Sequence, residues 1–164
     1  MKKFLLVFAL VAILTAGTAY ADHPGHLGIG IVGGYYGGWN GGGSPNWGLS
    51  LKLPVIPVFW GVWIPSFADP LVLHVTGDSY IFDLKLVPPI NLHWYLGLGG
   101  YVGLGFYDKL AIDLGVRVPI GLSWQPVKFL ELFFEVAPSF GVHIHEKATF
   151  GGGWPLGLGL RLWI

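Results

Sequence analysis

Apolar side chains occupy every second position from Leu110 to Trp124, and the positions between them are small or charged. Asp113 and Arg117 are the charged members of this second set. An alternation with a period of two residues predicts a β-strand with one apolar face and one small or polar face. Strands in globular proteins are usually about 5–6 residues long, so a strand of this length indicates a membrane-spanning barrel with lipid outside and a polar lumen inside.

The same pattern recurs along the chain and predicts eight strands, over about residues 27–36, 46–53, 58–64, 71–87, 91–106, 110–124, 128–145 and 151–164. The third strand is apolar on both faces, so its orientation stays open. In the fourth strand, Gly77 and Asp78 interrupt the alternation. This interruption indicates either one bulged strand or a long loop with an extra short strand. We expect the bulge, since glycine inside a strand often marks one.

The predicted connections between the strands are of two kinds. Those after the second, fourth and sixth strands are short and contain proline, whereas the loop over residues 37–45 is rich in glycine and polar residues. Bacterial barrels have short periplasmic turns and longer outer loops. The sequence therefore predicts an all-β protein, an eight-stranded antiparallel transmembrane up-and-down β-barrel.

The composition agrees with a barrel better than with a helical membrane protein. Apolar residues make up 53% of the 164 residues and charged residues only 11%, yet no apolar run reaches the roughly 20 residues of a transmembrane helix. The formal net charge is zero, which gives no support for a nucleic-acid partner. The chain has no cysteine, which excludes disulfides, thiol chemistry and lipid attachment to a cysteine.

Residues 1–21 have the features of a cleavable secretory signal. Lys2 and Lys3 provide a positive start, an apolar stretch covers residues 4–14, and Ala19-Tyr20-Ala21 forms a small-x-small cleavage site. The apolar stretch is too brief for a membrane anchor. We expect the barrel to span residues 22–164 and to reach the outer membrane of a diderm bacterium after Sec-type export.

The predicted barrel resembles, over its whole length, the small eight-stranded outer-membrane β-barrels of the OmpA/OmpX type. The pairing of R-V-P-I-G-L (117–122) with L-F-F-E-V-A-P (132–138) is similar to small outer-membrane barrels for which no activity is established. The last predicted strand also resembles the C-terminal signal read by the barrel-assembly machinery, although it ends on Ile164 instead of an aromatic residue; its apolar row is Leu156, Leu158, Leu160 and Leu162. The resemblance implies outer-membrane lipid and that machinery as partners, and a monomer.

Charged side chains of both signs fall on the faces predicted to point inward, namely Lys52, Lys85, Arg117, Arg161, Asp83, Asp113, Glu131 and Glu135. A loop over 125–127 and a turn at Ala148 would place Glu135 opposite both Arg117 and Arg161, and a turn at Asp108 would place Gly99 opposite Arg117. Because the lumen of eight strands is narrow enough to be filled by side chains, we expect an Arg–Glu–Arg layer that plugs it. An ion or proton path is the alternative.

Aromatic residues are predicted to sort toward the two ends of the barrel, as expected of interfacial girdles. The end with the proline turns would carry Trp94, Trp124 and Trp163, and the loop end would carry Tyr36, Trp39, Trp47 and Trp154.

No motif in the sequence specifies a metal, a cofactor or a catalytic set. His143 and His145 share the outer rim, but two ligands are too few for a zinc site. Ser123 and His143 are predicted at opposite ends of the barrel, and the spacing of His74, Asp78 and Ser79 does not specify a triad. We therefore expect a protein that is not an enzyme and needs no cofactor.

Three functions remain in order of preference. The first is a structural or surface-interaction barrel with a plugged lumen. The alternative is the binding or transport of small apolar molecules or lipid, through a lumen pocket lined by Val58, Trp60 and Val62. The third is a lipid-modifying outer-membrane enzyme.

The predicted signal leads to a testable outcome. After expression in a diderm host, N-terminal sequencing should find Asp22 as the first residue, and the protein should fractionate with outer membranes. It should also migrate differently on a gel when it is not boiled, because a folded barrel resists the detergent. An intact Met1, or a protein soluble without detergent, would contradict this interpretation.

Overall fold

The computed structural model describes residues 26–38, 42–65, 71–106 and 108–164. The predicted signal peptide and its cleavage site lie outside these residues. So do Trp39, parts of the loops predicted at 37–45 and 65–70, and Tyr107 in the predicted turn at Asp108.

The described chain is almost entirely β-strand. The strands are β1 (Gly28–Gly38), β2 (Gly43–Lys52), β3 (Phe59–Pro65), β4 (Leu71–Val87), β5 (Leu92–Phe106), β6 (Leu110–Arg117), β7 (Ile120–Val127), β8 (Leu130–Val136), β9 (Ser139–Ile144) and β10 (Ala148–Trp163), with one short 3-10 helix, η2 (Pro88–Ile90), between β4 and β5. Every strand pairing is antiparallel, and β1 pairs with β10, which closes the sheet into a barrel. No helix of the described residues is long and apolar enough to cross a membrane.

The ten strands correspond to the eight long strands that the sequence predicts, and each of these eight is called a wall below. β6 continues into β7 and β8 continues into β9, and each break falls at a proline, Pro119 or Pro138. Proline has no N–H and therefore interrupts a ladder. The backbone hydrogen bonds from Gly97 N to Pro119 O (2.8 Å) and from Val118 N to Pro138 O (2.9 Å) bridge the breaks, and the strand register is the same on both sides.

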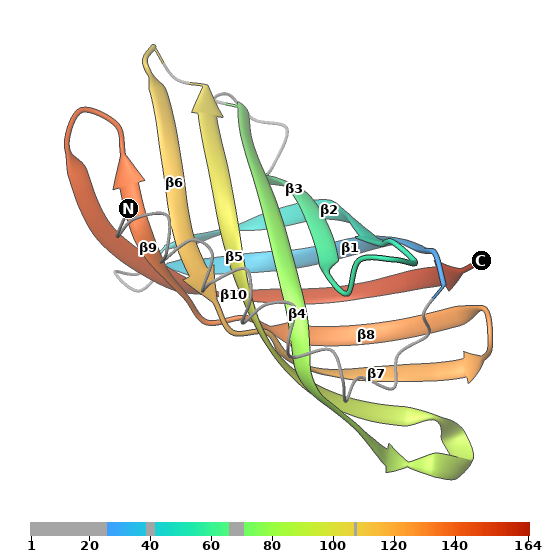
Figure 1. The fold of residues 1–164 in the computed structure, drawn as a ribbon. Coiled ribbons are helices and arrows are strands. Elements are labelled where there is room, and N and C mark those ends of the chain that lie inside the picture. Colours follow the sequence, from blue (N-terminus) through green and yellow to red (C-terminus); the bar gives the residue numbers. More distant parts are fainter. Residues whose placement is uncertain (1–25, 39–41, 66–70, 107) are drawn as a thin grey trace.

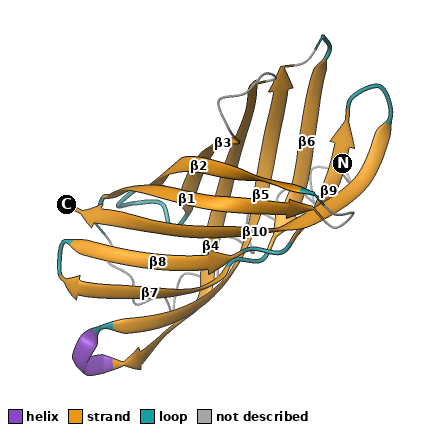
Figure 2. Cartoon of the chain, turned by 180° about the vertical axis from the view of Figure 1, so that it is seen from behind, coloured by secondary structure: helices purple, strands orange, loops and turns teal. Residues whose placement is uncertain are grey.

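Strands on opposite sides of the barrel cross at a steep angle. In Figure 1, β1, β2, β10, β8 and β7 run nearly sideways, while β4, β5 and β6 run steeply across them. Figure 2 shows the same crossing from behind, with the β4–β5 hairpin and its short helix at one end. Tilted strands are what closure of a barrel requires. The two ends will be called the loop end, where the β5–β6 and β9–β10 connections lie, and the turn end, where the β4–β5 and β7–β8 connections lie.

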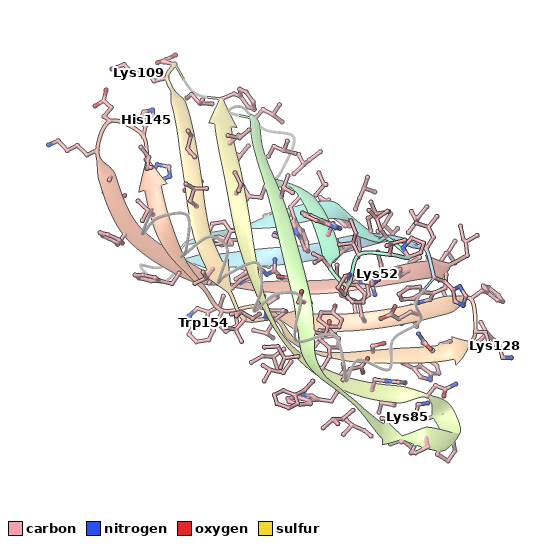
Figure 3. The ribbon with its side chains drawn as sticks, viewed as in Figure 1. Lys52, Lys85, Lys109, Lys128, His145 and Trp154 are labelled. Carbon is pink, nitrogen blue, oxygen red and sulfur yellow. The ribbon has the colours of Figure 1, made fainter. Side chains whose placement is uncertain are left out.

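Side chains alternate between lipid-facing and lumen-facing positions as the sequence predicts. In β1, Ile29 and Ile31 are exposed whereas Val32 is buried, and in β10, Leu158 and Leu162 are exposed whereas Arg161 is buried. Charged side chains therefore gather inside or at the ends, where Figure 3 shows Lys109 and His145 at the loop end and Lys85 and Lys128 at the turn end.

The structure also resolves the two strands that the sequence left open. In β3, Phe59 is buried, whereas Trp60 and Val62 are exposed on the outer surface. The pocket predicted from Val58, Trp60 and Val62 is therefore wrong, because the opposite face of β3 lines the lumen. β4 is one bulged strand, as expected, but its register shifts between Tyr80 and Phe82 and again between Lys85 and Val87, rather than at Gly77 and Asp78.

The outward face makes a prediction about stability in a bilayer. Val116 is exposed on the outer surface and lies next to the β6–β7 junction, midway along its wall. The substitution Val116→Arg should destabilise the folded barrel in lipid vesicles by about 2–4 kcal/mol, because the charge would face the hydrocarbon core. The control Val116→Ile should fold like the wild type. Equal urea midpoints for the arginine variant and the wild type would show that this face does not meet lipid.

Candidate functional site

The interior of the barrel has two parts, a closed half toward the turn end and an open cavity toward the loop end. Three groups of side chains fill the closed half: a cluster around Arg161, a stack of aromatic rings, and a cluster around Arg117. Arg117 lies at the boundary between the two parts, since its side chain also lines the open cavity.

The Arg161 cluster is a buried ion pair in which the guanidinium and the carboxylate also form further hydrogen bonds. Arg161 Nη1 donates to Glu131 Oε2 at 2.7 Å, and its Nε and Nη2 both donate to the hydroxyl of Ser50. Glu131 also accepts from Ser123 Oγ and from the indole N–H of Trp163, each at 2.9 Å. Buried charges are tolerated when they are paired and hydrogen-bonded in this way.

Aromatic rings surround the Arg161 guanidinium and extend from it across the lumen. The guanidinium carbon lies 4.7 Å from the ring centroid of Phe59 and 4.6 Å from that of Phe133, within cation–π range. Phe59, Tyr80 and Tyr95 form the aromatic stack, with successive ring centroids 4.1 and 4.3 Å apart. This stack connects the two clusters, because Phe59 lies beside Arg161 and Tyr95 contacts Glu135 of the Arg117 cluster.

The Arg117 cluster joins one guanidinium to two carboxylates. Arg117 Nε lies 3.2 Å from Asp78 Oδ1, and its Nη2 donates to Glu135 Oε1. The Tyr95 hydroxyl donates to the other oxygen of Glu135 at 3.1 Å. Between the two arginine clusters lies a cavity of only about 30 Å³, which is room for little more than a water molecule.

The open cavity has a volume of about 380 Å³. Its walls combine the aromatic rings of Tyr36, Trp63 and Tyr101 with polar side chains that include Asn46 and Asp113. Glycines opposite the rings make this space, since a Cβ on Gly115 or Gly141 would lie 2.5 Å from an atom of Tyr101. Tyr36 therefore faces the lumen and not the membrane interface, which corrects its predicted place in a girdle.

Asp113 lies in the cavity wall beside two histidines. His143 Nδ1 lies 2.6 Å from Asp113 Oδ1, and His74 Nε2 lies 3.8 Å from Asp113 Oδ2. The His74 ring stacks on Tyr101 with a centroid distance of 6.4 Å. The described residues contain no group of three or more histidine, aspartate or glutamate side chains placed to hold a metal ion.

The structure brings Arg117 and Glu135 together but separates Glu135 from Arg161. In the backbone register, Arg161 faces Glu131, and Glu135 faces Gly121 and Gly157. Gly99 faces Arg117 as expected. The predicted Arg–Glu–Arg layer is therefore replaced by two clusters. The two registers predicted from a loop over 125–127 and from a turn at Ala148 are wrong by four residues. The turns lie instead at residues 128–129 and 145–147, so each is centred about two residues away from its predicted place.

The remaining predicted lumen charges have separate partners. Lys52 donates to the backbone oxygens of Leu53 and Ile56, at 2.7 and 3.0 Å, and so holds the β2–β3 turn. Asp83 Oδ1 lies 3.1 Å from Nδ1 of His93, and both side chains are buried. Lys85 lies opposite the buried His93 in the register, so it has the predicted inward facing, but its side chain is exposed at the turn end.

The predicted interface tryptophans divide into four that face outward and one that does not. Trp47, Trp124 and Trp154 are exposed, and Trp94 is half-buried on the same outward face as these. Trp163 is only 6% exposed and donates to Glu131 inside the lumen. Its predicted place at the membrane interface is therefore wrong, since it shares the inward parity of Arg161.

The serine and histidine residues considered for catalysis do not meet. Ser79 Oγ donates to the backbone oxygen of Pro57, Asp78 contacts Arg117, and His74 contacts Asp113. Ser123 donates to Glu131 at the turn end. His143 and His145 lie at the rim with ring centroids 6.5 Å apart.

Several side chains of the interior were missed in the sequence. The alternation of strand four predicts an interruption at Asp78, whereas in the structure this residue is a partner of Arg117. The inward parity of Tyr80 and Tyr95 could have indicated the aromatic stack. No pattern in the sequence indicates the role of Asn46, whose surroundings depend on residues from other strands.

The Arg161 cluster generates a prediction about stability. Glu131→Ala should destabilise the barrel by about 3–5 kcal/mol, because it leaves a buried arginine without its carboxylate. The double variant Glu131→Leu with Arg161→Met should be milder, since it removes both charges. The control is Glu146→Ala, which breaks the exposed pair between Lys109 and Glu146 and should have little effect. Urea unfolding in detergent measures all three, and a double variant less stable than Glu131→Ala would disprove this account.

Comparisons with known proteins agree with the architecture. No family model matches the sequence, and no curated protein matches it. The crystal structure of Neisserial surface protein A superimposes with a TM-score of 0.52 and 11% identity, over 86% of this chain and 98% of that one. The N-terminal β-barrel domain of Pseudomonas aeruginosa OprF superimposes with a TM-score of 0.54 and 12% identity, over 82% of this chain and 96% of that one. With its closed antiparallel sheet, the chain thus has the fold of the small eight-stranded outer-membrane β-barrels of the OmpA/OmpX type.

Proposed function

We propose that the protein is a non-conducting barrel of the bacterial outer membrane, with a structural or surface-interaction role. The observation that carries this proposal is the closed half of the lumen. Two buried arginine clusters and the aromatic stack between them occupy the interior, and only a cavity of about 30 Å³ separates the clusters. Eight strands enclose little more than the volume of such side chains.

The outer surface supports the membrane location. Exposed apolar side chains follow the outward positions of successive strands, for example Leu49, Val102, Phe134 and Leu158. A contiguous apolar surface of this kind is costly in water and is the normal outer face of a membrane barrel. We place the loop end outside the cell and the turn end in the periplasm, because short proline turns are typical of the periplasmic side.

The proposal includes the route and the assembly state expected from the sequence. Residues 1–21 direct Sec-type export, the last strand engages the barrel-assembly machinery, and the closed β1–β10 pairing leaves a monomer complete. Catalysis is not part of the proposal, since the serine hydroxyls that were considered are bonded elsewhere. A lipid-modifying enzyme remains the third and least supported function.

Conductance measurements test the proposal. The refolded wild-type protein in planar bilayers should show no steady ion current, because the two arginine clusters and the aromatic stack fill the closed half. Liposomes that contain it should not swell in permeant sugars. A large porin reconstituted in the same way is the positive control, and heat-modifiable migration shows that the sample is folded. A steady open current from folded protein would disprove the plugged lumen.

A further inference from the structure

The open cavity at the loop end is not needed to close the barrel, yet it has the size of a ligand site. Small-molecule pockets usually measure about 300–1,000 Å³ and combine apolar walls with a few polar groups, and this cavity measures about 380 Å³. Its floor is the Arg117 cluster, so a molecule entering from the loop end would stop there. An inference about its occupant does not depend on whether the barrel conducts ions.

One buried acceptor in the cavity wall lacks a hydrogen bond. Asn46 is only 7% exposed and lines the cavity, and its Oδ1 accepts from no described residue. An unsatisfied buried polar atom is costly and calls for a partner. Because Oδ1 is an acceptor, the missing partner is a donor, an N–H or O–H group located in the cavity.

The charges around the cavity favour a cationic donor. Asp78 and Glu135 share the guanidinium of Arg117, so this arginine is already paired and does not offer a free positive charge to a ligand. Asp113 is the carboxylate that belongs to the described lining itself, and its ion-pair contacts among the described residues are the imidazoles of His74 and His143. The described lining contains no lysine and no arginine other than Arg117, so no permanent positive charge remains there to attract an anion.

The described lysine and arginine side chains outside the lining do not supply this cation either. Lys109 at the rim is 70% exposed and is paired with Glu146. Lys52 and Arg161 are held at the other end of the lumen, by backbone oxygens and by Glu131.

The aromatic walls suit a flat organic body attached to the cation. Tyr36, Trp63 and Tyr101 all line the cavity, and aromatic faces attract cations. We propose that the open cavity binds a small aromatic primary ammonium compound, whose N–H groups donate to Asn46 Oδ1 and whose charge is balanced by Asp113.

Calorimetric titration of the refolded barrel in an uncharged detergent tests this proposal with four related probes. They are phenethylammonium, its trimethylated derivative, the neutral phenethyl alcohol and the anionic hydrocinnamate. At about pH 8, where histidine is ordinarily neutral, phenethylammonium should bind at least about tenfold more tightly than the alcohol. Hydrocinnamate should bind most weakly. The trimethylated compound should lose the part of the affinity that comes from N–H donation.

Two variants separate the contributions of charge and hydrogen bonding. Asp113→Asn should weaken phenethylammonium binding by about tenfold and leave the alcohol unchanged. Asn46→Leu, which keeps the branched shape of the side chain but removes its polar atoms, should weaken phenethylammonium binding but not the binding of the trimethylated derivative. Glu146→Gln is the matched control, because it removes a carboxylate at the rim outside the cavity and should change nothing. Heat-modifiable migration of each variant shows that it is folded.

Distinct results would overturn the proposal. If hydrocinnamate or phenethyl alcohol binds as tightly as phenethylammonium, the cavity is not selective for cations. If Glu146→Gln lowers affinity as much as Asp113→Asn, the effect is one of overall surface charge. Absence of binding by phenethylammonium at millimolar concentration would also reject it, and this failure would leave the closed half and the conductance result unaffected.

Discussion

The interior of this barrel depends on the pairing of buried charges. Lipid on the outside forces polar side chains inward, and the lumen of eight strands is too narrow to surround each charge with water. Arg161 meets this constraint through Glu131 and Ser50, and Arg117 meets it through Asp78 and Glu135. The wall positions beside them must then be small or supply hydrogen bonds, as Ser123 does for Glu131.

Glycine and aromatic residues divide the remaining volume between them. The Tyr101 ring occupies space that side chains at positions 115 and 141 would fill if these residues were not glycine. The Tyr36 ring likewise occupies the space beside Gly153. In the closed half, three stacked rings join the two arginine clusters. Toward the loop end, Tyr36, Trp63 and Tyr101 line the open cavity instead of filling the lumen. The same residue types thus produce a plug at one end and an open site at the other.

Because of this asymmetry, we propose that the loop end is the functional end of the molecule. Asp113, Asn46 and Arg117 are on strands and not on loops, so the barrel holds them in a fixed arrangement. Rigid elements position binding groups more accurately than loops do. A barrel closed below and open above is suited to holding a small molecule or presenting a surface, and unsuited to passing solutes across the membrane.

The sequence by itself determined the architecture, because the alternation of side chains is a local property with a period of two residues. It predicted the eight walls, the bulged strand and the lumen-facing positions of Arg117, Arg161, Glu131 and Glu135. Trp163 has the same inward parity as Arg161, so the alternation alone places it in the lumen. For this residue the alternation predicts the position correctly, whereas the general preference of tryptophan for membrane interfaces does not. The backbone breaks at Pro119 and Pro138 also follow from a local cause, the missing N–H.

Only the tertiary structure decided which charges meet. A displacement of two residues in a turn shifts the cross-strand partner by four residues without changing which face a side chain occupies, so Glu131 and not Glu135 pairs with Arg161. Contacts across the lumen, such as those of Asp78 with Arg117 and of Tyr95 with Glu135, join strands that are not neighbours in the sheet. The cavity beside Asn46 likewise arises only when the sheet closes, because its walls come from strands distributed around the whole barrel.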